Sequence, residues 1–124
     1  MGLISDIWDA LVEGIKGIWN MCVKVVKAVV NFIADVFNWL KNFFTDDDDD
    51  DNKDGIVVDW PKLVKKAKEE GAVIDLGLKH QKGVGAGVFD HSTNKITAFK
   101  SIDASERDEK TEKILNGRNL VIVS

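Results

Sequence analysis

The sequence predicts an α+β protein with a long N-terminal amphipathic helix, an acidic linker and a small C-terminal α+β domain. Three observations lead to this prediction: apolar residues at helical spacing in the first third of the chain, six consecutive aspartates (46–51), and short apolar runs separated by turn signals from Gly55 onward. They divide the chain into an assembly helix at 1–44, a linker at 45–55 and a head domain at 56–124.

Apolar residues recur at steps of three and four through residues 1–44, which is the spacing of one face of an α-helix. Gly14 and Gly17 mark the expected bend in this helix. At about 1.5 Å per residue such a helix is roughly 60 Å long, and its stripe exposes on the order of 600 Å² of apolar surface, at or above what a monomer tolerates. The expected interface residues are Ile4, Ile7, Trp8, Leu11, Ile15, Ile18, Trp19, Cys22, Val26, Val29, Ile33, Val36, Phe37, Leu40 and Phe43.

Three surfaces are candidates to cover this stripe. The first candidate is another protein, either a copy of the chain or a different partner. The polar face of the helix favours this candidate, because it carries equal numbers of acids and lysines and is therefore neutral. A membrane surface is the second candidate, although helices that lie on anionic lipid usually have a basic polar face. The third is the chain's own C-terminal domain. Charged and amide side chains interrupt the stripe, and Asp6 and Asp9 stand where a signal peptide is basic, so we expect neither a transmembrane span nor a Sec signal peptide.

The linker is strongly acidic, because residues 45–59 contain eight aspartates against Lys53, a net charge of −7. Mutual repulsion predicts an extended, solvated spacer. Its end resembles the start of a calcium loop of the form D-x-[DN]-x-[DN]-G, with Asp50, Asn52 and Asp54 as candidate Ca²⁺ ligands. Pro61 occupies the position where such a loop needs a bidentate Glu, and an ordinary turn before a strand is the competing interpretation.

The C-terminal domain is expected to have the order β-α-β-β-β-α-β. Asp59 is the expected N-cap of its first helix, and 91–94 the turn of a hairpin. The expected strands are 56–58, 72–78, 84–90, 95–102 and 120–123, and the expected helices run from Trp60 or Pro61 to Glu70 and from Asp103 or Ser105 to Leu115.

The sequence contains no catalytic signature. The glycines at 83, 85 and 87 lack the G-x-G-x-x-G spacing and lead into a strand, and the adjacent residues 90–92 are unsuited to a catalytic relay. His80, His91 and the single Cys22 make a poor zinc set. A net charge of −4 provides no general attraction for nucleic acid. We therefore expect no enzyme, no small-molecule substrate and no nucleic-acid partner.

The resulting functional prediction is a structural protein that assembles into homo-oligomers through its N-terminal helix and displays its head, as in a filament, shell or virion component. One alternative is a peripheral membrane-binding or membrane-active protein whose helix lies in the lipid interface. A second alternative is a calcium-dependent binding module. A lysine cluster at 62–68 is expected to be a solvated face, or to meet the aspartate run of a neighbouring subunit.

Overall fold

A computed structural model describes residues 3–18, 23–42, 53–71 and 82–123. The described elements form a five-stranded mixed sheet with helices on both faces, so the α+β class is confirmed. In chain order they are α1 (Leu3–Ile18), β1 (Val23–Val30), the π-helix η2 (Phe32–Phe37), α2 (Asn38–Lys41), β2 (Lys53–Asp59), α3 (Trp60–Glu69), β3 (Val84–Asp90), β4 (Lys95–Arg107), α4 (Glu109–Leu115) and β5 (Leu120–Ile122).

The strands lie in the order β1-β4-β3-β2-β5. β3 and β4 form an antiparallel hairpin that closes at the four-residue turn 91–94, and β2 pairs antiparallel with both β3 and β5. β1 differs, because it pairs parallel to β4, with Val25 opposite Ile102. The two edges of the described sheet are therefore β1 and the short strand β5.

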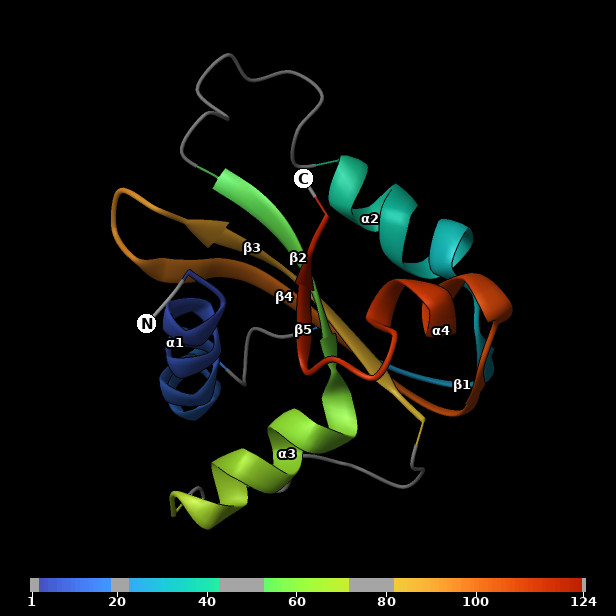
Figure 1. Ribbon diagram of the computed structural model, residues 1–124, viewed down its shortest axis with the longest axis horizontal. Helices are drawn as coiled ribbons and strands as arrows, with labels where there is room; N and C mark the ends of the chain where they lie inside the picture. The colour runs from blue at the N-terminus through green and yellow to red at the C-terminus, as the bar shows by residue number, and fades with distance from the viewer. Residues whose placement is uncertain (1–2, 19–22, 43–52, 72–81, 124) are drawn as a thin grey trace.

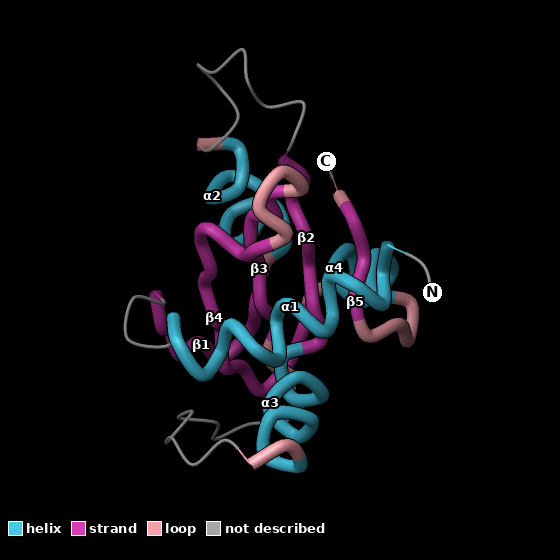
Figure 2. Tube along the Cα trace, turned by 90° about the vertical axis from the view of Figure 1, so that its left-hand side faces the viewer, coloured by secondary structure: helices cyan, strands magenta, loops and turns pink. Residues whose placement is uncertain are grey.

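Helices α1 and α3 cover one face of the sheet, and Figure 2 shows α1 crossing in front of the strands above α3. Ile7 and Leu11 of α1 are buried there against a core that includes the Trp60 and Phe99 rings, whose centroids are 5.7 Å apart. η2, α2 and α4 cover the opposite face (Figure 1). Val36 and Leu40 are buried in that second core. The sheet is thus sandwiched between two helical layers.

The predicted single helix over residues 1–44 is wrong. α1 ends at Ile18, residues 23–30 form a strand inside the same sheet as the C-terminal strands, and the chain then turns into η2 and α2. Valine accounts for five of the eight residues of β1, and its β-branched side chain suits a pleated strand better than a helix. Of the three predicted covers for the apolar stripe, the described contacts support the chain's own C-terminal region.

The C-terminal predictions are mostly confirmed. Asp59 caps α3 by accepting the Lys62 N–H at 3.2 Å, and the strands predicted at 56–58 and 84–90 lie in β2 and β3. The strand predicted at 120–123 is β5, which ends at Ile122. One helix start is wrong: β4 continues to Arg107, since β1 pairs along its second half, and Asp103 is a buried strand residue. α4 begins only after its cap, Asp108. The strand predicted at 72–78 lies outside the described residues.

Candidate functional site

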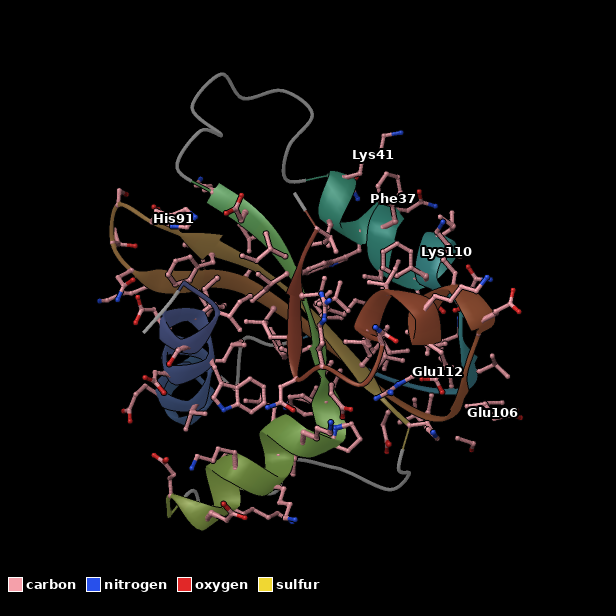
Figure 3. The ribbon with its side chains drawn as sticks, in the orientation of Figure 1. Phe37, Lys41, His91, Glu106, Lys110 and Glu112 are labelled. Carbon is pink, nitrogen blue, oxygen red and sulfur yellow. The ribbon has the colours of Figure 1, made fainter. Side chains whose placement is uncertain are left out.

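Exposed apolar side chains gather on two consecutive elements, β1 and η2. Six large hydrophobic side chains are exposed among the described residues, and only Ile4 of α1 lies elsewhere. Val26, in the middle of β1, is the most exposed of the six at 61%. Figure 3 shows Phe37 in the outer helical layer. We call these five residues the β1–η2 surface: Val23, Val26, Val29, Ile33 and Phe37.

The strand in this surface is also an edge strand. β1 pairs with β4 on one side, and no other described strand pairs with it on the other. An eight-residue edge that is rich in valine is a template for pairing with another strand, which proteins normally block with charges, proline or a bulge. β1 contains Lys24 and Lys27 but no proline, and its pairing with β4 keeps one register throughout.

Asp35 fixes η2 against β1. Its carboxylate receives the Lys27 ammonium at 2.7 Å and the Asn31 N–H at 2.7 Å, while the Lys100 ammonium donates to its main-chain oxygen at 2.9 Å. Burial alone raises the pKa of Asp35, but these hydrogen bonds and the charges of Lys27 and Lys100 outweigh burial, so its pKa is lowered. Burial also lowers the pKa of Lys100, although Asp35 opposes this effect.

Asp108 joins the start of η2 to α4. Its side chain accepts the N–H of Thr111 at 2.9 Å, which caps α4, and the N–H of Phe32 at 3.1 Å. Its own N–H donates to the Val30 oxygen at 2.9 Å. Burial raises the pKa of Asp108, but the hydrogen bonds from Thr111 and Phe32 outweigh it and the pKa is lowered. The β1–η2 surface is therefore held by two buried or half-buried carboxylates.

The predicted interface residues fall into three groups. Four of them are buried in the two cores: Ile7, Leu11, Val36 and Leu40. Trp8 is half-buried at the edge of one core. Five are exposed: Ile4, Val26, Val29, Ile33 and Phe37. Nothing is described for the side chains of Ile15, Ile18, Trp19, Cys22 and Phe43. The structure thus separates one predicted stripe into core residues and the β1–η2 surface.

The candidate calcium ligands are largely outside the described residues, which include neither Asp50 nor Asn52. Asp54 lies in β2, where its carboxylate is 2.8 Å from Nε2 of His91. Ser92 donates instead to Asp90, at 2.6 Å, so residues 90–92 do not form a relay. Among the described residues, no three His, Cys, Asp or Glu side chains gather as a metal site.

Two open grooves flank α1. The first, of about 530 Å³, lies between α1 and the start of β4 and is lined by acids of α1. The second, of about 450 Å³, lies between α1, α3 and the segment before β5. Its lining combines one indole with three lysines: Trp8, Lys62, Lys65, Lys66, Glu69 and Asn119. The sequence predicted these lysines to be a solvated face or to meet the aspartate run of a neighbouring subunit. Their position beside Trp8 depends on helix packing that the sequence does not reveal.

Sequence reasoning missed Asp35 and Asp108. A signal existed for Asp108, because Asp followed three residues later by Thr111 is a local capping pattern. For Asp35 the partners Lys27 and Lys100 come from two strands whose pairing is not local.

Comparison with known proteins finds no matching family model, no matching curated protein and no matching solved structure. Within the described part of the chain, no helix combines the length and apolar character that crossing a membrane requires.

Proposed function

We propose that this chain is a structural protein that self-associates, and that two copies pair through the open edge of β1. The observation that carries the proposal is the coincidence of the edge strand with the β1–η2 surface, which holds five of the six exposed large hydrophobic side chains of the described residues. An edge strand is self-complementary, since its free N–H and C=O groups match those of an identical strand. The proposed site of association is therefore β1, in place of the long helix that the sequence predicted.

The register of this pairing follows from strand geometry. In an antiparallel pair, opposite residues both point their main-chain groups toward the partner or both point them away, so a twofold axis passes through a residue. An axis through Val26 pairs residues 23–29 with their copies and brings the most exposed valine against itself. Val23 then lies opposite Val29, and Lys24 opposite Ala28.

The lysines of β1 favour the same register. An axis through Lys27 sets two ammonium groups opposite each other, which is unfavourable. With the axis at Val26, Lys27 lies opposite Val25 and its charge is already compensated by Asp35 at 2.7 Å. The paired sheets would form one continuous ten-stranded sheet, flanked on the η2 side by Ile33 and Phe37.

The test is the mass of the full chain in detergent-free buffer by light scattering over a range of concentrations. We expect the wild type to dimerise or form larger species, and Val26→Lys to shift it to monomer, because the axis would bring two new ammonium groups together. Ile4→Lys is the matched control, since Ile4 is also an exposed apolar residue, at 45%, but lies on α1. A monomeric wild type, or Val26→Lys and Ile4→Lys with equal effects, would contradict the proposal.

A further inference from the structure

The second groove beside α1 places an unusual combination of side chains together. α1 contributes Trp8, α3 contributes the lysines, and the segment before β5 contributes Asn119. Lys62, Lys65 and Lys66 share one face of α3 because they stand three and four positions apart. The groove opens to solvent on a chain that is otherwise acidic, with a net charge of −4.

The lysines of the groove are only weakly neutralised by the described residues. Lys65 has no ion pair among them. Lys66 lies 3.4 Å from the exposed Glu70 carboxylate, a type of surface pair that contributes little. Lys62 donates to the Gly117 oxygen at 3.2 Å and lies 4.0 Å from Asp59. Three ammonium groups along one wall are suited to the oxygens of a phosphate or diphosphate group.

The other lining residues match the remaining parts of a nucleotide. Trp8 is half-buried: it packs against the core and also lines the groove, where it is the aromatic group available to a base. The Glu69 carboxylate is an acceptor for ribose hydroxyls, and the Asn119 amide offers both a donor and an acceptor to a base edge.

We propose that this groove binds a nucleoside phosphate, with the lysines on the phosphates and Trp8 against the base. A free nucleotide fits better than a nucleic-acid strand, because a long polyanion would also meet the chain's excess negative charge. The inference concerns a surface separate from β1 and does not depend on self-association.

The first experiment measures the binding of ADP to the full chain by calorimetry. Lys65→Gln is expected to weaken ADP binding about tenfold, as the loss of one charge-assisted hydrogen bond predicts. Lys68→Gln is the matched control: Lys68 is another exposed lysine of α3, but it does not line the groove, and we expect less than about a twofold change. Equal weakening by both substitutions would mean diffuse charge attraction and would overturn the proposal, as would no binding of ADP.

The second experiment tests the base. We expect Trp8→Leu to weaken ADP binding about tenfold and Trp8→Phe to retain most of it, because an aromatic face is what stacking requires. Urea unfolding of both variants shows whether they keep the fold. Pyrophosphate is the probe without a base, and its binding should be weaker than that of ADP and insensitive to either Trp8 variant. Pyrophosphate bound as tightly as ADP would overturn the nucleotide assignment.

Discussion

The guanidinium of Arg107 lies 3.2 Å from the Asp59 carboxylate, with only 7% and 11% of the two side chains exposed. Arg107 also donates to the main-chain oxygens of Lys82 and Gly83, at 3.1 and 2.8 Å. Since Asp59 caps α3 through Lys62, this pair connects the end of β4, the start of α3 and the approach to β3. One arginine thus links three segments that are distant in sequence.

Replacing Arg107 by Met is expected to lower the free energy of unfolding by about 3 kcal/mol, because the Asp59 charge and two main-chain oxygens lose their donor in a buried setting. The measurement is urea unfolding followed by circular dichroism. Lys113→Met is the control, since Lys113 pairs with Glu109 while both are largely exposed, and we expect a change within about 0.5 kcal/mol. Similar losses in the two variants would show that the Arg107 pair is no more important than a surface pair.

The glycines of β3 permit close contact with neighbouring strands. A Cβ at Gly85 would lie 2.6 Å from the Phe99 ring and 2.8 Å from Val58. We expect Gly85→Ala to cost about 2 kcal/mol of stability through this overlap. The double variant Gly85→Ala/Phe99→Leu should show less than the sum of the two single losses, because the smaller side chain relieves the overlap. Strict additivity in the same unfolding measurement would contradict this explanation.

The fold should lose stability in acid below about pH 4 through Asp35 and Asp108. Both have a pKa lowered by folding, so their stabilising contribution is complete above the unfolded value of about 4 and is lost as pH falls through the lower folded value. Asp35→Asn and Asp108→Asn should each reduce stability near neutral pH and flatten its decline in acid. Urea unfolding midpoints measured from neutral pH down into acid test both effects. Asp6→Asn, exposed on α1, is the control, and its urea midpoint should decline with falling pH as in the wild type.

The C-terminal elements were predictable because their signals are local. Asp59 with Pro61 marks a helix start, and the turn at 91–94 separates two apolar runs. Which ring reaches Gly85 depends instead on how β3 pairs with β4, because the ring belongs to Phe99 in that adjacent strand. The end of β4 was misjudged because its second half is stabilised by β1, a partner about 77 positions away by register.

The N-terminal elements were not predictable from spacing alone. Apolar residues at three- and four-residue steps describe a helix, but Val23, Val26 and Val29 fit that pattern while belonging to a strand. β-branched composition was the competing signal, and pairing with β4 decided the outcome. The second groove beside α1 was not predictable either. Its lysines are visible in the sequence, but their position beside Trp8 follows from how α1 and α3 pack on the sheet.

The proposed register across β1 makes a geometric prediction. In a chain with Cys22 replaced by Ser, Val26→Cys should form an intermolecular disulfide on mild oxidation, because opposite residues in an antiparallel pair have Cα atoms about 4.5–5.5 Å apart, within the range of a disulfide. Non-reducing electrophoresis measures the dimer. Ala28→Cys is the control on the same strand: an axis through Val26 offsets its two copies by four residues, about 13 Å, which is too far for a disulfide. If Ala28→Cys gives as much dimer as Val26→Cys, the disulfides form by random encounter and the two β1 strands do not pair in this register. If neither variant gives a dimer, the copies do not pair through β1.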